Sequence, residues 1–157
     1  RPLSDLLDPS TTTSFDLDGS GVPQQWSWIA RDTALLCWDP TRSGRITSGR
    51  QLFGSVSWWL FFANGYDALD ALDDDRDGKL TGAELRGLAA WFDRNGNGIS
   101  DSGEVIPIEE LGVVELSCCA TDHVGESPCN HSGLRLASGA VLPTYDWVAH
   151  AAPEPTR

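Results

Sequence analysis

Short apolar runs rather than long amphipathic stretches dominate the first third of the chain. Residues 26–29 read Trp-Ser-Trp-Ile and residues 34–38 read Ala-Leu-Leu-Cys-Trp, and both runs are rich in the aromatic and aliphatic side chains that favour strands. Three closely spaced glycines, Gly44, Gly49 and Gly54, then break the chain into turns. The pattern predicts two short strands followed by a stretch rich in loops.

The middle of the chain carries helical spacing. Tyr66, Leu69 and Leu72 recur at this spacing and predict a helix of about two turns. Residues 83–92 predict a second helix, because their apolar positions fall at i, i+3, i+4 and i+7. These positions are Leu85, Leu88, Ala89 and Phe92.

Short elements return towards the C-terminus. Pro107 and Gly112 bracket a third short helix, since proline suits the first turn of a helix and glycine suits its C-terminal cap. Residues 113–117 predict a strand, and residues 134–142 predict a hairpin around Ser138-Gly139. The expected fold class is therefore α+β, with helices in the middle and short antiparallel strands on either side.

The two ends of the chain differ from its middle. Residues 1–14 contain two prolines and a Ser/Thr run, and they predict a flexible or docking N-terminal segment. Residues 151–157 predict a frayed C-terminal tail, and residues 15–150 predict a single domain. The sequence begins at Arg1 and contains no methionine, which indicates a processed chain or a fragment.

Two segments follow the twelve-residue pattern of a calcium loop. Calcium takes six to eight oxygen ligands, which such a loop supplies from side chains at positions 1, 3, 5 and 12, a carbonyl at position 7 and a side chain or water at position 9. Position 6 is glycine, which permits a sharp turn. Residues 73–84 and 93–104 match these positions. The expected ligands are Asp73, Asp75, Asp77, Lys79 (carbonyl) and Glu84 in the first loop, and Asp93, Asn95, Asn97, Ile99 (carbonyl), Asp101 and Glu104 in the second.

Only residues 85–92 separate the two loops, so one helix is expected to end the first loop and to begin the second. The prediction is a tandem EF-hand-like pair that shares this helix and binds calcium in a structural role. Such a unit is poorly suited to the helix opening by which calcium sensors expose a groove. The alternative interpretation is a pair of solvated acidic turns. It does not account for a glutamate at position 12 of both loops.

Two weaker copies of the pattern lie upstream. Residues 16–27 begin like a calcium loop but have a serine at position 12, so a metal there needs ligands from elsewhere. Residues 39–50 keep the shape but contain three arginines, which oppose a cation and predict a loop without metal. The third, weaker candidate site consists of Asp16, Asp18 and Ser20.

Composition narrows the classes of function. The formal net charge is −12, which disfavours nucleic acid as a partner because phosphate would be repelled. The longest apolar run, residues 58–63, is far shorter than the ~20 residues of a membrane span. The three histidines have no evident serine or cysteine partner in a nucleophile motif, so no enzymatic activity is expected.

The order of the motifs resembles a known family. FDLDGSGV, WDPTRSGRITSGRQLFG, NGYDALDALDDDRDGKLTGAEL, WFDRNGNGISDSGEV and ELGVVELS follow one another over residues 15–117. This order resembles EF-hand calcium-binding modules of secreted bacterial proteins, including the calcium-dependent self-processing modules of repeat-toxin (RTX) proteins. The resemblance implies an extracellular location. Self-processing modules cut an Asp-Pro bond shortly before their first calcium motif, whereas the nearest pair here, Asp8-Pro9, lies farther upstream of Asp16 than in that family.

The cysteines leave two interpretations open. One is a zinc site, and the other is a disulfide from Cys118 or Cys119 to Cys129, which an extracellular location favours. Cys37 is either a buried thiol or the partner of the remaining cysteine. Asn130 begins a glycosylation sequon. The zinc-type ligands near the C-terminus are Cys118, Cys119, His123, Cys129 and His131.

Three functions are compatible with these observations. The favoured one is an extracellular structural or adhesive module that calcium stabilises, in which residues 1–14 dock on a second copy by strand addition and build a homopolymer. The second is a calcium-triggered module that cleaves itself at Asp8-Pro9. The third is a calcium sensor.

Overall fold

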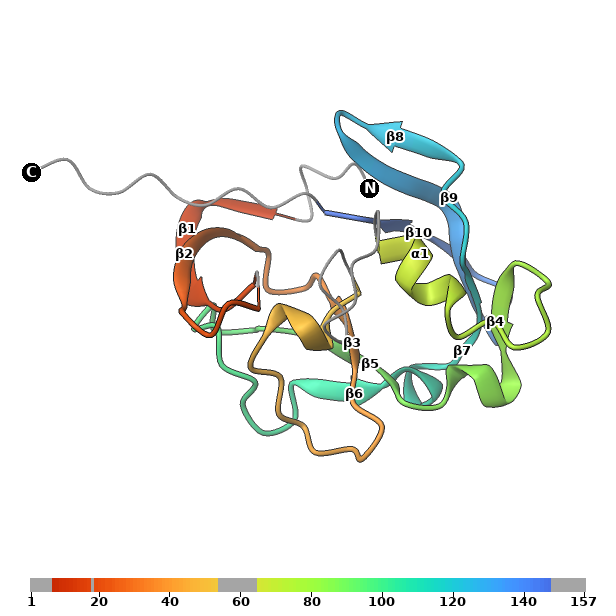
Figure 1. The fold of residues 1–157 in the computed structure, drawn as a ribbon, viewed down its shortest axis with the longest axis horizontal. Helices are drawn as coiled ribbons and strands as arrows, with labels where there is room; N and C mark the ends of the chain where they lie inside the picture. Colours follow the sequence, from red (N-terminus) through yellow and green to blue (C-terminus); the bar gives the residue numbers. More distant parts are fainter. Residues whose placement is uncertain (1–6, 18, 54–64, 148–157) are drawn as a thin grey trace, which may run out of the picture.

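The computed structural model describes residues 7–17, 19–53 and 65–147. This part of the chain contains ten strands, one α-helix and short 3-10 helices at Gly49–Gln51, Gly82–Leu85 and Ile108–Leu111 (Figure 1). The elements are β1 (Leu7–Phe15), β2 (Gln24–Ile29), β3 (Leu35–Trp38), α1 (Gly65–Asp70), β4 (Lys79–Thr81), β5 (Leu88–Trp91), β6 (Val105–Pro107), β7 (Val113–Ser117), β8 (Asp122–Val124), β9 (Ser127–Leu136) and β10 (Val141–Tyr145).

The strands form three small antiparallel sheets. β1 pairs with β2, β5 lies between β3 and β6, and the largest sheet has the order β10-β9-β7-β4 with β8 on β9. In Figure 1 the two-stranded sheet and the largest sheet lie on opposite sides, and the β3-β5-β6 sheet lies between them. Because each sheet is small, the loops that connect them contribute much of the structure.

The helix expected over residues 83–92 does not form. The chain makes a 3-10 turn and then strand β5, and Gly87 separates the two with a φ of +88°. A side chain at Gly87 would meet the ring of Trp38 at 2.8 Å, so this turn is tightly packed. All four residues of β5 are buried, because it is the central strand of its sheet. A short apolar run that is buried on both faces gives the same pattern as the apolar face of a helix.

The predicted fold class is therefore wrong. The described residues form a mainly β structure with a single short helix, α1, so tandem EF-hand loops that share a helix are not present among them. Leu80, at position 8 of the first loop, pairs with Leu116 of β7 rather than with the second loop. No helix among the described residues is long and apolar enough to cross a membrane.

Several individual elements lie where the sequence places them. The apolar runs at residues 26–29 and 34–38 fall in β2 and β3, and residues 113–117 form β7. β9 and β10 form the expected hairpin, and Gly139 takes a φ of +92° in its turn. Gly112 caps the short helix after Pro107 in a left-handed conformation, although that helix is of the 3-10 type.

Two apolar cores hold the sheets together. Leu80, Leu88 and Leu116 are nearly inaccessible in the first core, which lies beneath the loop of residues 73–84. The second core is aromatic, and the rings of Phe15, Trp28 and Trp91 have centroids 5.4–5.9 Å apart. Burial of three large aromatic side chains stabilises this region, since each removes 150–250 Å² from water.

The ends of the chain are described only in part. Residues 7–14 belong to β1 and pair with β2 of the same chain, with a register shift between Asp8 and Thr12. Residues 1–6 of the predicted N-terminal segment and residues 151–157 of the predicted tail lie outside the described residues. Phe15, at the end of β1, anchors this strand in the aromatic core.

The aromatic core depends on one buried polar contact. Trp28 Nε1 donates to Asp93 Oδ2 at 2.7 Å, whereas Trp26 Nε1 donates to the neutral Phe15 carbonyl at 2.8 Å. We expect Trp28→Phe to lower the free energy of unfolding by about 2 kcal/mol or more and Trp26→Phe by about 1 kcal/mol. Trp28 is 0% exposed, so its replacement leaves a cavity and also removes a hydrogen bond from a buried carboxyl group, whereas Trp26 is only partly buried. Urea denaturation without calcium measures both losses. Equal losses of unfolding free energy would show that the contact with Asp93 contributes no more to stability than the contact of Trp26 does.

Candidate metal centres

Four loops share two hydrogen bonds and two positive φ values at equivalent, described positions. They are residues 16–27, 39–50, 73–84 and 93–104, and each places its fourth and sixth residues at positive φ. In each, Oδ2 of the first aspartate accepts the N–H of the glycine at position 6, over 2.8–3.1 Å. The N–H of position 7 then donates to the side-chain oxygen of position 5, over 2.9–3.3 Å. The weaker upstream motifs therefore fold in the same way as the two strong ones.

The residue at position 12 separates the four loops into two kinds. Glu84 folds back over its loop and accepts the N–H groups of Asp74 at 2.6 Å and Thr81 at 3.2 Å. Glu104 accepts the equivalent N–H groups of Arg94 and Asp101, both at 3.0 Å. Both glutamates thus hold two carboxylate oxygens at the mouth of the loop, which is the arrangement that a bidentate calcium ligand requires.

Loop 73–84 brings four acidic side chains close together, and the group contains no basic side chain. Asp73, Asp75, Asp77 and Glu84 each offer one oxygen, and these four atoms lie within 4.8 Å of one another. Asp73 is only 4% exposed, and its Oδ1 accepts no hydrogen bond. A buried acceptor without a donor is unfavourable, so this oxygen indicates a ligand of positive charge.

The pKa values in loop 73–84 reflect this crowding. Burial raises the pKa of Asp75, and the neighbouring carboxylates of Asp73 and Asp77 raise it further. Burial also acts to raise the pKa of Asp73, but the N–H of Gly78 and other hydrogen bonds outweigh it and lower the pKa. The pKa of Asp73 is thus lowered and that of Asp75 is raised, which is the expected result of packing like charges together.

In loop 93–104, hydrogen bonds donated by residues of the loop itself stabilise its acidic side chains. Asp93 is 1% exposed, and its Oδ2 accepts from Trp28 and from the N–H of Gly98. The side-chain amides of Asn95 and Asn97 both donate to Asp101 Oδ2 at 2.9 Å. These two hydrogen bonds lower the pKa of Asp101. The side chains of Asn95, Asn97 and Asp101 are thus brought together. Among the described residues, the acidic oxygens of Asp93, Asp101 and Glu104 do not form a group within 4.8 Å as those of loop 73–84 do.

Arginine takes the place of the acidic ligand in the upstream loops. Arg42, at position 4 of loop 39–50, lies 3.8 and 3.5 Å from Glu109 and Glu110 on the surface. Arg50, at position 12 of the same loop, does not fold back as a glutamate does. Its Nη2 donates to the Gly19 carbonyl in loop 16–27, and its side chain packs against that glycine. A permanent cation therefore lies against the third candidate site.

The third candidate site is described in part. Asp16 and Ser20 take their expected positions in loop 16–27, and Asp16 Oδ1 is buried and accepts no hydrogen bond. Asp18 lies outside the described residues.

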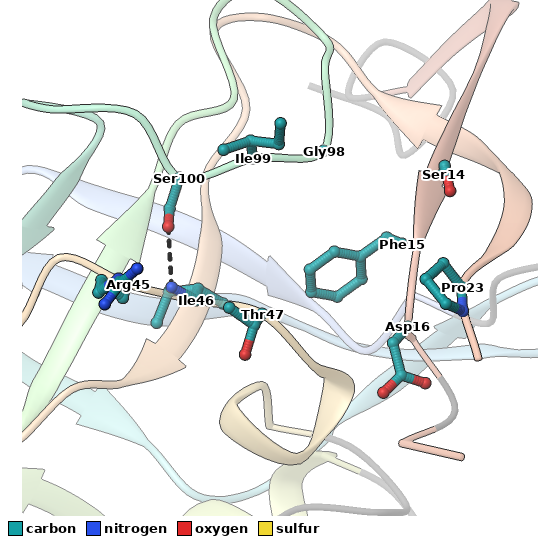
Figure 2. A pocket seen from close by; sticks show the side chains of 10 residues that line it. All are labelled: Ser14, Phe15, Asp16, Pro23, Arg45, Ile46, Thr47, Gly98, Ile99 and Ser100. Carbon is teal, nitrogen blue, oxygen red and sulfur yellow. Dashed lines mark hydrogen bonds between the residues drawn. The ribbon is translucent and has the colours of Figure 1, made fainter. Parts of the chain in front are cut away.

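A pocket of about 370 Å³ lies among three of the loops (Figure 2). Its lining comes from β1 and from loops 16–27, 39–50 and 93–104. The Ile46 N–H of loop 39–50 donates to Ser100 Oγ of loop 93–104 at 2.8 Å. Ile46 and Ser100 both stand at position 8, so these two loops pair with each other at the place where paired calcium loops usually meet. The lining residues are Ser14, Phe15, Asp16, Pro23, Arg45, Ile46, Thr47, Gly98, Ile99 and Ser100.

The zinc-type ligands divide between two places. His131 Nε2 lies 3.2 Å from Asp122 Oδ2 and 4.0 Å from Cys129 Sγ. Cys118 lies instead beside Asp70 and Asp73. All four cysteines are free thiols in this structure, so the disulfide stays a prediction. Asp8 of the Asp8-Pro9 pair lies in β1, opposite Trp28.

Sequence reasoning missed the partners that come from distant segments. Trp28 binds Asp93 across 65 residues of sequence, and no local spacing indicates that contact. Arg50 was expected only to oppose a cation in its own loop, whereas it reaches the neighbouring one. The charge of Arg50 at position 12, where glutamate is usual, was the available signal.

Comparisons with known proteins identify the family. A family model described as SPM domain matches residues 5–139. The iron-regulated protein FrpA of Neisseria meningitidis serogroup C is 33% identical over 113 residues, which cover 69% of this chain and 10% of FrpA. The chain thus spans about a tenth of the length of that relative.

These findings correct the family resemblance drawn from the sequence. They support an SPM domain and a likeness to an iron-regulated protein in place of the EF-hand modules that the sequence resembled. The described residues agree with this correction, because an EF-hand has a helix on each side of its loop. Here α1 precedes loop 73–84 but a 3-10 turn and β5 follow it, and strands β5 and β6 flank loop 93–104. The chain belongs to the SPM domain family.

Proposed function

We propose that this chain is an extracellular structural module in which two calcium ions stabilise loops 73–84 and 93–104. The observation that carries the proposal is the group of four acidic oxygens within 4.8 Å in the first loop, together with the buried, unsatisfied Oδ1 of Asp73. Oxygen-only ligands from a flexible loop suit calcium, whereas magnesium prefers few protein ligands and several waters. Glu84 and Glu104 supply the bidentate ligand in the two loops.

The same geometry favours two ions over four. Loop 39–50 carries arginine at positions 4, 7 and 12, and loop 16–27 receives the guanidinium of Arg50 against its Gly19 carbonyl. The positive charge of these arginines disfavours the binding of a metal cation in either loop. Asp16, Asp18 and Ser20 therefore form the weakest candidate, and metal in that loop requires displacement of Arg50.

A structural role for calcium fits the way the loops are built into the sheets. Loop 73–84 contains strand β4, which pairs with β7. The Phe92 N–H donates to the Glu104 carbonyl at 2.9 Å across the base of loop 93–104. Calcium sensors work by opening a pair of helices. The described residues contain one helix of six residues, so a sensor mechanism has less support than stabilisation.

The N-terminal strand is tied to the second loop. Thr13 Oγ1 donates to the Gly96 carbonyl at 2.8 Å, and Gly98 lies so close to the Ser14 carbonyl that a side chain would clash with it. Calcium in loop 93–104 would therefore stabilise the surface against which β1 packs. We propose that β1, or the segment of residues 1–14 that contains most of it, can make the same contacts with a second copy and assemble a homopolymer by strand exchange.

Calcium titration tests the core of the proposal. We expect two ions per chain by calorimetry, and a rise in Tm on the order of 10 °C when both sites are saturated, because each ion contributes about 2.7 kcal/mol at a hundredfold excess over its Kd. Glu84→Gln should leave one ion. Glu110→Gln removes the same charge from the surface outside the loops and should leave two. An unchanged Tm with and without chelator would overturn the proposal.

Hydrogen exchange tests the link between the second loop and the N-terminal strand. In saturating calcium, Glu104→Gln should raise amide exchange in residues 7–15 by at least tenfold, because the loop beneath β1 loses its metal. Glu84→Gln is the matched control, since loop 73–84 lies against the other core, and it should leave this exchange unchanged. Equal exchange in both variants would show that β1 is held independently of the metal.

Light scattering after size exclusion tests assembly. We expect calcium to increase the mass of the full chain above that of a monomer, and deletion of residues 1–14 to abolish the increase. A monomer at all calcium concentrations would remove the assembly part of the proposal and leave calcium binding intact.

A further inference from the structure

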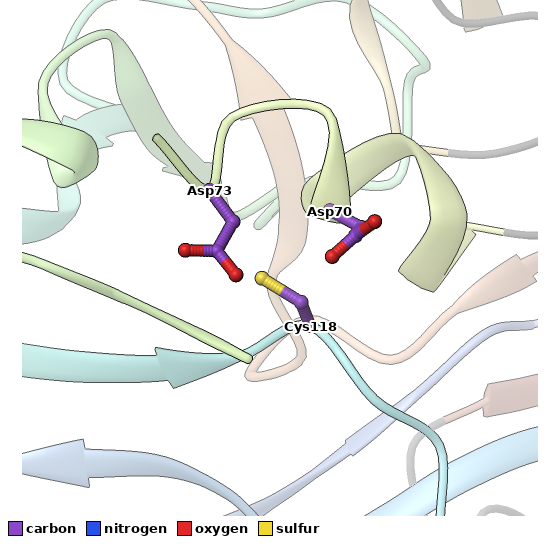
Figure 3. Close-up of side chains that lie close together, drawn as sticks. All are labelled: Asp70, Asp73 and Cys118. Atoms are coloured by element: carbon purple, nitrogen blue, oxygen red, sulfur yellow. The ribbon is translucent and has the colours of Figure 1, made fainter. Parts of the chain in front are cut away.

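Three chemically different groups meet beside loop 73–84. Asp70 ends α1, Asp73 begins the loop, and Cys118 follows β7. Figure 3 shows the Cys118 sulfur pointing toward the carboxylates of Asp73 and Asp70. One ligand atom from each residue lies within 4.8 Å of the other two. A soft sulfur ligand and two carboxylates are therefore assembled from three separate elements.

The backbone fixes this arrangement. The Cys118 N–H donates to the Gly78 carbonyl at 3.0 Å, and the Gly78 N–H donates to Asp73 Oδ2 at 2.8 Å. The Asp73 N–H donates to the Asp70 carbonyl at 3.1 Å, which places the two carboxylates one turn apart. The sulfur is thus held against the first ligand of the loop by hydrogen bonds that do not involve the side chain of Asp70.

Burial and an unsatisfied oxygen mark the meeting point of these side chains. Asp73 is 4% exposed, and its Oδ1 accepts no hydrogen bond. Cys118 is also 4% exposed, and its sulfur lies within 4.8 Å of an oxygen of Asp73 and an oxygen of Asp70. A divalent cation among these atoms stabilises a thiolate and neutralises the two carboxylates together.

We propose that Cys118 Sγ, Asp70 and Asp73 form a binding site for a thiophilic divalent cation such as Zn²⁺ or Cd²⁺, and that this cation excludes calcium from loop 73–84. Exclusion follows because both ions require Asp73, and this part rests on the proposed calcium loop. The thiolate site itself does not. Binding converts the thiol to a metal thiolate, and its proton is released to solvent.

The ligand set distinguishes this ion from calcium. Calcium takes oxygen ligands, whereas thiolate selects zinc and softer metals. Zinc with one sulfur and two oxygens at about 2.0–2.3 Å leaves its fourth position to water. Tetrahedral geometry at those bond lengths needs ligand atoms about 3.5 Å apart. Asp70 is exposed, so its side chain is free to rotate towards the sulfur and shorten these distances.

Cadmium titration of the calcium-free full chain tests the site. The readout is the near-ultraviolet charge-transfer absorption of a cadmium thiolate, in a reductant that is not a thiol. We expect the absorption in the unmodified chain and in Cys119→Ser, and its loss in Cys118→Ser. Cys119 is the matched control because it is the adjacent residue and its thiol is exposed. Absorption that persists in Cys118→Ser, or that disappears only in Cys119→Ser, would overturn the proposal.

A second variant tests the site without disturbing the fold or the proposed calcium loop. Asp70→Asn changes an exposed side chain outside the loop, so it should weaken cadmium binding about tenfold and leave two calcium ions per chain. Unchanged cadmium affinity would exclude Asp70 from the site. Calcium at saturation should weaken cadmium binding at least tenfold, and a lack of competition would overturn the shared role of Asp73. Two calcium ions with no cadmium thiolate absorption would overturn the thiolate site alone and leave the proposed function standing.

Discussion

A carboxylate that accepts the N–H of a glycine five residues later closes each of the four loops, and the arrangement of the sheets depends on it. Three sheets of two to five strands offer little continuous hydrogen bonding between one another. The loops connect them instead, and Asp93 does so most directly, because it closes its own loop and accepts the indole N–H of Trp28 in the aromatic core. A buried polar group of this kind is costly unless its hydrogen bonds are made.

The four loops differ in the groups that surround their acidic side chains. Loop 93–104 places two amides beside Asp101, and loop 39–50 surrounds Asp39 with the hydroxyl and N–H of Ser43 and the N–H of Gly44. Loop 16–27 receives an arginine from its neighbour. Loop 73–84 alone among the four brings four carboxylates together without a protein cation among them. Local charge balance therefore differs between loops whose backbones are alike.

Local features of this structure could be predicted from the sequence, and long-range ones could not. The loop boundaries follow from the fixed spacing of Asp, Gly and Glu, and β2, β3, β7 and the final hairpin follow from short apolar runs and turn residues. Residues 88–91 were misjudged because a strand that is buried on both faces has no alternating pattern. The contacts of Trp28 with Asp93 and of Cys118 with Asp73 join segments far apart in sequence, so only the fold brings them together.

The likeness of the four loop backbones has a consequence for how binding capacity can change. Residues at positions 4 and 6 already have the required φ values in all four loops, including Arg42 in loop 39–50. The four loops therefore differ in the side chains that face the loop centre, while the backbone at these two positions is already the same. A change in what a loop can bind would need exchange of a few side chains and no rebuilding of the chain around them.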